Sequence, residues 1–553
     1  MPLAASRSPL NFALILHTHL PFVLGHGRWP HGSDWLMEAA ADSYLPILES
    51  LEALRRDHVA APMTIGVTPI LAAQLASSAF ADELDRFLAQ RLAACDDAEG
   101  DMADTADAYL IPIVRYWRRW YAARATQFAE LDRDIAGALR RLESDGRIEL
   151  MSSAATHGFL PLLARDESIR LQLLAGRDEH RRVFGHDATG CWLPECAYRP
   201  QGEWAPWPGV QSRWRPGIEV ELERAGYRFV VVDAHLVKAG EPLNAYSARV
   251  APRGIARRSP YEAYAIGYGS GAIRALVRDP ASTEHVWSRH AGYPGGAHYL
   301  EFHKLRFPGG LQLWEVTASD ASLGDKRPYS PDHARALARE HGAHFAATLG
   351  ALSARTTTGH GGGITAPFDA ELFGHWWFEG PVFLESMYRA LQATPGLRPV
   401  PASTLASAAD VTPIDLPAGS WGRDGDFSVW LHEGTAWTWQ RLWSLEERFW
   451  DAAPAALSQE SAHTVLAQAA RELLLAQASD WQFMMTAGAV PDYAERRFCF
   501  HADAVDELVG ALERGGDLTT ATARAVELGE QDFVFPLVLA AVARAVTGAV
   551  VAA

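Results

Sequence analysis

Cysteine is scarce in this chain, and the few thiols do not form a recognisable motif. Only four cysteines occur among 553 residues, and none of them belongs to a CxxC pair or a zinc-type spacing. A disulfide framework and a structural metal site are therefore not expected. A protein with so few cysteines suits a reducing compartment, and we expect a cytoplasmic location.

Long apolar runs are missing as well. No segment approaches the roughly 20 apolar residues that a membrane span requires. The first apolar stretch, Phe12 to Leu16, is too short for the core of a signal peptide and is followed at once by His17. We therefore expect no membrane partner and a protein that is retained inside the cell.

Basic clusters are also absent, whereas tryptophan is plentiful. The chain has 67 acidic and 50 basic residues, a net charge of -17, and no basic run with interleaved aromatic residues, so nucleic acid is not an expected partner. Nineteen tryptophans are many for this length. Most should pack in cores, and the remainder suit a cleft for a neutral, ring-shaped substrate such as a carbohydrate.

Short apolar runs alternate with helical stretches, and most of these runs end in polar residues. This pattern is typical of a parallel α/β barrel or a related open sheet, in which chemistry collects at the carboxyl ends of the strands. The runs expected as strands are 11–16, 64–69, 148–152, 190–193, 229–233 and 363–367. The polar residues that follow them include His17, His157, Glu195, His235 and Asp369.

The length exceeds what one hydrophobic core usually supports, so we expect more than one domain. Residues 1–400 read as a barrel-type catalytic domain, interrupted by a helical insertion at about 81–145. Residues 239–280 contain Gly, Pro and Tyr with little periodicity, which indicates a long lid loop over the cleft. Residues 401–553 show helical periodicity and should form a mostly α-helical C-terminal domain that contributes to the substrate cleft.

Two acidic residues lie among aromatic ones at expected strand ends. Glu195 follows Trp192-Leu193-Pro194, and Asp369 follows Phe368 and precedes the His375-Trp376-Trp377 segment. Desolvation raises the pKa of one carboxyl group in such surroundings while a better hydrated one stays ionised, which is the division of labour that cleavage of an acetal bond needs. The structural alternatives are a buried salt bridge from Glu195 to Arg199 and a helix N-cap role for Asp369.

His17 and His19 alternate along one extended segment, so both side chains should project toward the same cleft. Such a pair suits a metal site if His157 or Asp233 supplies a third ligand. Neutral imidazoles that hydrogen-bond sugar hydroxyl groups or support a nucleophile need no such ligand. We favour the second interpretation and expect no metal and no other cofactor.

Five motifs in order resemble those of glycoside hydrolase family 57, and within it the glucan branching enzymes. The resemblance extends over almost the whole chain. The motifs are His17-Thr18-His19-Leu20-Pro21, Thr156-His157-Gly158, Trp192-Leu193-Pro194-Glu195, Phe368 to Trp377, and Ala478-Ser479-Asp480-Trp481. The resemblance implies an incomplete (β/α)7 barrel followed by a helical domain, with an α-1,4-glucan as donor and acceptor. It also implies Glu195 as the nucleophile and Asp369 as the general acid/base of a retaining reaction.

The same resemblance implies a lid-loop tyrosine, for which Tyr246 is the candidate. The substrate-binding residues that we expect are His17, His19, Trp29, His157, Tyr246, Arg278, Trp287, His375, Trp421, Trp430 and Asp480. The stretch 247–278 fits the family pattern poorly. Oligomeric state is not predicted.

Four activities are compatible with these residues. The leading hypothesis is branching, which cleaves α-1,4 bonds and forms α-1,6 bonds. The nearest alternative is an α-amylase-type hydrolase or a 4-α-glucanotransferase with the same carboxylates. A metal-dependent polysaccharide hydrolase or deacetylase would use His17, His19 and an aspartate, and a non-catalytic glucan-binding protein would retain only the tryptophans.

Overall fold

The architecture is taken from a computed structural model of the chain. It describes residues 9–28, 31–238, 258–267, 273–288, 292–318, 320–356, 362–409 and 411–548.

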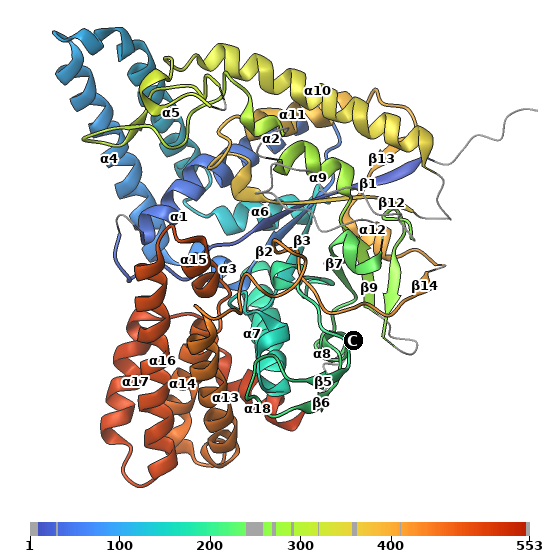
Figure 1. Cartoon of the computed structure of the whole chain (residues 1–553). Coiled ribbons are helices and arrows are strands. Elements are labelled where there is room, and N and C mark those ends of the chain that lie inside the picture. The colour runs from blue at the N-terminus through green and yellow to red at the C-terminus, as the bar shows by residue number, and fades with distance from the viewer. Residues whose placement is uncertain are drawn as a thin grey trace, which may run out of the picture.

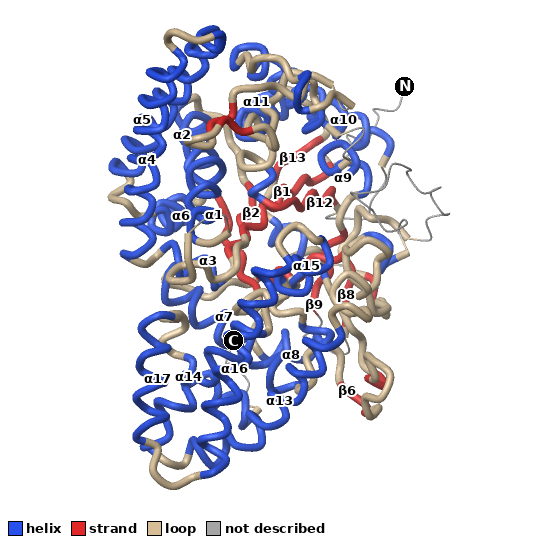
Figure 2. Tube along the Cα trace, turned by 60° about the vertical axis from the view of Figure 1, so that its left-hand side comes forward, coloured by secondary structure: helices blue, strands red, loops and turns tan. Residues whose placement is uncertain are grey.

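A curved, mostly parallel sheet forms the centre of the molecule (Figures 1 and 2). Its strands are β1 (Leu10–Thr18), β2 (Met63–Val67), β3 (Ile148–Ser153), β4 (Gly190–Trp192), β7 (Phe229–Val232), β8 (Tyr264–Ile266), β9 (Ile273–Val277), β12 (Gly363–Asp369), β13 (Leu397–Pro399) and β14 (Thr412–Pro413). The strand order is β12-β1-β2-β3-β4-β7-β9-β8-β14, and β13 pairs with β1. Every residue of β1 is buried, as expected for a strand covered on both faces.

The sheet curls until its ends meet. The segment directly after β9 forms a parallel bridge to β12 through Arg278 and Thr365. Seven parallel strands, β12, β1, β2, β3, β4, β7 and β9, therefore surround a common axis and bring their carboxyl ends to one mouth. All six runs that the sequence analysis expected as strands are strands, and the predicted incomplete (β/α)7 barrel is confirmed.

Helices surround the sheet, and two of them, α4 (Ser78–Met102) and α5 (Ile111–Glu130), extend away from it. The barrel helices are α1 (Ser33–Ala39), α2 (Leu45–Arg56), α3 (Pro69–Leu75), α7 (Asp166–Phe184), α8 (Ile218–Arg224), α9 (Pro280–Trp287), α10 (Pro331–Arg355), α11 (Gly380–Leu391) and α12 (Ala402–Ala406). Between β2 and β3 lie α4, α5 and α6 (Ile135–Ser144). These three occupy the segment expected as a helical insertion, and α4 and α5 pack side by side at one end of the molecule (Figures 1 and 2).

The expected lid loop at 239–280 needs correction. Two strands lie inside it, because β9 pairs in parallel with β7 and β8 pairs antiparallel with β9. The hydrophobic residues of these strands form short runs that are separated by glycines. The runs are too short to show a strand pattern in the sequence. The first part of α9 also falls within the segment. Residues 239–257 and 268–272 lie outside the described residues.

The last part of the chain is helical. Its helices are α13 (Ala436–Leu457), α14 (His463–Ala476), α15 (Asp480–Ala487), α16 (Pro491–Arg514), α17 (Thr519–Gln531) and α18 (Val538–Thr547). Figure 1 shows α13, α14, α16 and α17 side by side below the sheet, with α15 at the end of the bundle nearest the barrel. Among the described residues, no helix has both the length and the apolar character that a membrane crossing requires.

Buried amide groups join this helical bundle to the barrel. Gln172 of α7 donates from Nε2 to Oε1 of Gln477 at 2.9 Å, and Gln477 donates from Nε2 to Oε1 of Glu446 in α13 at 2.7 Å. The backbone N–H of Ser479 donates to the carbonyl of His157 at 3.1 Å. These contacts fix the start of α15 against the loop after β3, so side chains from the helical bundle can reach the barrel mouth.

Candidate active site

The two predicted catalytic carboxyl groups lie at the ends of strands on opposite sides of the barrel. Glu195 follows β4 in the short 3₁₀ helix η4 (Pro194–Cys196), and Asp369 ends β12. Going around the barrel, β4 lies four strands from β12 in one direction and three in the other. The negative charge of Glu195 contributes, after burial and Glu371, to the raised pKa of Asp369, so the two groups interact electrostatically.

The backbone at the strand ends is strained. Glu195 adopts φ 60° and ψ 23°, and Cys196 and His157 also have positive φ values of 48° and 57°. Such conformations cost residues other than glycine about 1–3 kcal/mol, and strained residues of this kind cluster at functional sites. The tight turn after β4 directs the Glu195 side chain toward the mouth.

Glu195 is held by two donors from distant parts of the chain. Trp421 donates from Nε1 to Oε2 at 2.8 Å, and Ser479 donates from Oγ to Oε1 at 2.9 Å. Burial raises the pKa of Glu195, whereas these two hydrogen bonds oppose the rise. The structural alternative of a salt bridge to Arg199 is wrong, because that guanidinium donates to the carbonyl groups of Pro200 and Pro216.

A chain of hydrogen bonds continues from Glu195 through two histidines. The Ser479 hydroxyl proton is committed to Glu195, so its oxygen accepts from Nδ1–H of His157 at 3.0 Å. Nε2 of His157 then accepts from Nε2–H of His17 at 3.2 Å. This assignment requires a neutral His157, because its Nε2 accepts, and burial lowers the pKa of both His157 and His17 well below the usual range. His17 also stacks on Trp192, with ring centroids 4.4 Å apart.

Asp369 lies in an environment that favours its protonated form. Burial raises its pKa to about 8, and the neighbouring negative charges of Glu371 and Glu195 add to the effect, while Arg278 and His19 oppose it. It precedes the 3₁₀ helix η8 (Ala370–Leu372), but its side chain makes no capping hydrogen bond. The N-cap alternative is therefore wrong, and the carboxyl group is available to donate a proton.

Glu371 lies beneath this site. Its Oε1 accepts from the Tyr44 hydroxyl at 2.5 Å and from the backbone N–H of His19 at 3.1 Å. Burial raises the pKa of Glu371, whereas the Tyr44 hydrogen bond lowers it. The structure thus places a second acidic side chain next to the proton donor.

His19 is paired with Asp480 at the start of α15. Its Nε2 lies 3.0 Å and 3.1 Å from the two carboxylate oxygens, and its Nδ1 lies 3.1 Å from Oγ1 of Thr68. Burial lowers the pKa of His19, but Asp480, Glu195 and Glu371 together outweigh this effect and the net shift is upward. Nε2 therefore donates to Asp480, and Nδ1 pairs with the Thr68 hydroxyl, which can donate or accept.

The possible metal ligands differ from those expected. His19, His157 and Asp480 offer ligand atoms within 4.8 Å of one another, whereas Asp233 accepts from His235 and Arg278 at 2.9 Å each and is not available. His19 hydrogen-bonds Asp480 and His157 hydrogen-bonds Ser479, so these side chains already have protein partners.

Two further predicted residues, Arg278 and Trp287, contact the ring of Trp421 beside Glu195. Arg278 is buried, pairs with Asp233, and places its guanidinium carbon 5.3 Å from the centre of the Trp421 ring. Trp287, at the end of α9, meets the Trp421 ring edge-on at 6.4 Å. His375 lies on a different flank, where its Nδ1 is 3.7 Å from Oδ2 of Asp42.

Trp430 does not match its predicted role. Its ring is only 1 % exposed and packs against Phe159 at 4.6 Å, beneath the turn at Gly422. The ring cannot stack on a sugar in this arrangement, and it supports the loop that carries Trp421 instead. Trp29 and Tyr246 lie outside the described residues.

Sequence reasoning missed the roles of Ser479, Glu371 and Tyr44. The first two belong to the quoted motifs, one residue before Asp480 and two after Asp369, so their position was a usable signal. Tyr44 offered none, because its contact with Glu371 joins residues 327 positions apart.

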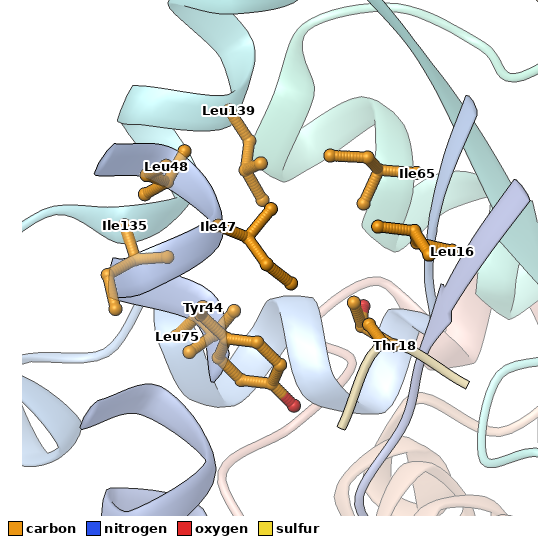
Figure 3. Close-up of a pocket in the computed structure, with 10 residues that line it drawn as sticks. Leu16, Thr18, Tyr44, Ile47, Leu48, Ile65, Leu75, Ile135 and Leu139 are labelled. Atoms are coloured by element: carbon orange, nitrogen blue, oxygen red, sulfur yellow. The ribbon is translucent and has the colours of Figure 1, made fainter. Parts of the chain in front are cut away.

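A small apolar cavity lies below the acidic residues. Figure 3 shows it between β1, β2, α2 and α6, lined by residues such as Leu16, Ile47 and Leu139. Its volume of about 20 Å³ cannot hold a sugar ring. This cavity is therefore not a candidate substrate site.

Known proteins share both parts of this arrangement. The family model of glycosyl hydrolase family 57 matches residues 13–404, and that of the 1,4-alpha-glucan branching enzyme C-terminal region matches residues 441–542. The 1,4-alpha-glucan branching enzyme of Thermococcus kodakarensis is 37% identical over 515 residues, covering 90% of this chain and 73% of that protein. A probable 1,4-alpha-glucan branching enzyme of Mycobacterium tuberculosis is 32% identical, covering 93% of this chain and 94% of its own.

Solved structures agree in fold. The crystal structure of the Thermococcus kodakarensis branching enzyme superposes with a TM-score of 0.88 at 35% identity, covering 96% of each chain. An alpha-amylase from Thermotoga maritima gives 0.80 at 25% identity, covering 97% of this chain and 99% of its own. Together with the strand-end carboxyl groups, these matches show that the chain belongs to glycosyl hydrolase family 57.

Proposed function

We propose that this chain is a 1,4-alpha-glucan branching enzyme that works by a retaining double displacement. The observation that carries the proposal is the placement of Glu195 and Asp369 on opposite strands of the barrel mouth. The named activity of relatives that span both the barrel and the helical bundle supports it.

The first half-reaction cleaves an α-1,4 bond. A Glu195 oxygen attacks the anomeric carbon, and the bond from that carbon to the departing oxygen breaks. Asp369, whose pKa is raised to about 8, gives its proton to that oxygen. The product is a glycosyl group joined to Glu195 as an ester. Trp421 and Ser479 keep the attacking carboxylate oriented through their hydrogen bonds.

The second half-reaction transfers the glycosyl group. Asp369, now ionised, takes the proton from the 6-hydroxyl group of another glucan chain. That oxygen bonds to the anomeric carbon while the ester bond to Glu195 breaks, which restores both carboxyl groups and leaves an α-1,6 branch. Water in place of the acceptor would give hydrolysis.

The linkage in the product tests this proposal. The protein is incubated with amylose, and anomeric proton NMR counts α-1,6 linkages while a reducing-end assay counts hydrolysis. New α-1,6 linkages with few new reducing ends are expected. Release of reducing sugar without branches would reject branching, and lengthened linear chains would indicate glucanotransferase activity.

Hydrolysis remains the second candidate, because the Thermotoga maritima structure that superposes so extensively is named an alpha-amylase. A covalent-trapping experiment separates mechanism from product. An activated fluoro-glycoside should leave a mass adduct on a peptide that contains Glu195. An intact protein mass that stays unchanged during turnover of this reagent would reject the covalent intermediate.

A further inference from the structure

Two adjacent tryptophans after β12 have opposite environments. Trp377 is 2% exposed and packs against Phe383, whereas Trp376 is 50% exposed. The turn that carries them is fixed, because the N–H groups of Trp376 and Trp377 donate to the carbonyls of Glu371 and Leu372 at 3.1 and 2.9 Å. The exposure of Trp376 is therefore imposed by an ordered backbone.

Trp376 is paired with another aromatic ring. Its centroid lies 4.6 Å from that of Phe302, which comes from the segment before the β10 (Leu305–Arg306) and β11 (Leu311–Gln312) hairpin, and the two planes meet at 32°. Phe302 also contacts His303 and His375, at 5.2 and 5.4 Å between ring centroids. The two rings are thus bordered by the exposed imidazole of His303, which can hydrogen-bond hydroxyl groups, and by the mostly buried imidazole of His375.

This pair lies on a different flank of the mouth from Trp421. Trp421 contacts Glu195, Trp192 and Arg278, which follow or belong to β4 and β9. The Trp376 turn is joined instead to the segment after α1, because the His375 N–H donates to Oγ of Ser43 at 2.9 Å. Trp376 is also linked to the site itself, since it bonds the carbonyl of Glu371.

We propose that Trp376 and Phe302 form a binding subsite for an α-glucan segment outside the position where the bond is cleaved. The inference rests on the proposed function. Glucose units present apolar faces that stack on exposed rings and hydroxyl groups that suit the neighbouring imidazoles. A stable protein interface needs roughly 800 Å² from each partner, whereas a tryptophan and a phenylalanine supply about 150–250 Å² each.

The test measures binding apart from turnover. Trp376→Ala and Phe302→Ala are made in the Glu195→Gln background, and calorimetry gives the Kd for a linear maltooligosaccharide long enough to span the mouth. We expect Kd to rise about tenfold for Trp376→Ala and less for Phe302→Ala. Trp376→Tyr, which keeps a stacking ring, should recover most of the affinity.

Trp214 provides a matched control. It is 62% exposed on β6 (Arg213–Arg215), which pairs with β5 (Gly202–Trp204), and Figures 1 and 2 both place β6 far from β12. Trp214→Ala should bind glucan with the parental Kd. Equal affinities of the Trp376→Ala and Trp214→Ala proteins, with equal unfolding temperatures, would overturn the inference. A changed molecular mass in solution with unchanged affinity would do the same and point to a protein contact.

The two proposals fail in different ways. If the wild-type protein forms no α-1,6 linkages but Trp376→Ala weakens glucan binding, branching is rejected and the subsite stands. If branches form and Trp376→Ala binds glucan normally, the subsite is rejected and branching stands.

Discussion

Two buried groups of histidines and carboxylates can be compared directly, one at the barrel mouth and one inside the helical bundle. Each offers three ligand-type atoms within 4.8 Å: His19, His157 and Asp480 in the first, and Glu472, His501 and Asp532 in the second. The residue types are almost the same. Their partners decide what each group does.

In the bundle, an arginine completes the network. Arg497 donates from Nη2 to Nε2 of His501 at 3.1 Å, so the other ring nitrogen carries the proton and donates to Glu472 at 2.7 Å. Burial, together with Arg497, lowers the pKa of His501 well below its usual range. Asp532 accepts from His26, of the loop after β1, at 2.6 Å. This network is a structural clamp between bundle and barrel.

Among the residues that the structure describes at the mouth, no arginine contacts His19, and Asp480, Glu195 and Glu371 raise its pKa against the effect of burial. The imidazoles lie next to Glu195, the proposed nucleophile, whose hydrogen bonds come from neutral donors. In the bundle, an arginine hydrogen-bonds the histidine that pairs with a carboxylate, and we infer a structural role for this pair. At the mouth the histidine–carboxylate pair has no such arginine partner among the described residues, and we infer a role in the reaction. Four predictions test this comparison, beginning with the largest effect.

Replacing Glu195 by Gln should lower the transfer rate by about 10⁴ or more, because the nucleophile is lost. Stability should not fall, since burial raises the pKa of this carboxyl and its charged form therefore destabilises the folded state at neutral pH. Rate assays and thermal unfolding measure both effects. A lower unfolding temperature together with normal activity would contradict the assignment.

Replacing His501 by Leu should lower the free energy of unfolding by roughly 3 kcal/mol, because Arg497 and Glu472 are buried and each loses its hydrogen bond to the imidazole. Turnover, measured well below the unfolding temperature, should stay within about twofold of wild type. His19→Leu is the matched variant and should show the reverse, with a large loss of turnover. The comparison breaks if both variants lose mainly stability.

The rate should decline as pH rises through about 8, where Asp369 loses its proton. The sign follows from its role: the acid must be protonated to cleave, so kcat/KM is retained below this pKa and lost above it. Glu371→Gln removes a neighbouring negative charge and should shift the decline to lower pH. Glu371→Asp keeps the charge and should return the decline part of the way to its wild-type pH. A profile that is identical in all three proteins would show that Glu371 does not influence the acid.

The smallest effect is expected for Ser479→Ala. One hydrogen bond contributes about 0.5–1.5 kcal/mol, so the rate should fall several-fold. The acidic limb of the pH profile should move to higher pH, because the Ser479 hydrogen bond lowers the pKa of Glu195 and the variant lacks it. Ser479→Thr keeps the hydroxyl and provides the control. An unmoved acidic limb would mean that Ser479 only packs against the site.

Much of the barrel could be predicted from the sequence, because its central strands are continuous apolar runs with polar residues at their ends. Strand β9 could not, because its five residues lie in a glycine-rich stretch whose pairing with β7 is purely tertiary. At the site, local motifs located Glu195 and Asp369. The tryptophan pattern could not separate Trp421 from Trp430, because only packing decides which ring is exposed.

Nor could the sequence place Tyr44 or distinguish the two histidine–carboxylate groups. Those distinctions depend on contacts such as Tyr44 with Glu371 and Arg497 with His501. The first joins residues far apart in the chain, and the second depends on how a helix packs.

The two hydrogen bonds to Glu195 come from residues that are translated long after Glu195 itself. A ribosome makes the carboxyl group at position 195 first, then its indole donor at position 421, and last its hydroxyl donor at position 479. During translation the nascent barrel therefore carries a nucleophile without its donors. The site is completed only after most of the chain has been made.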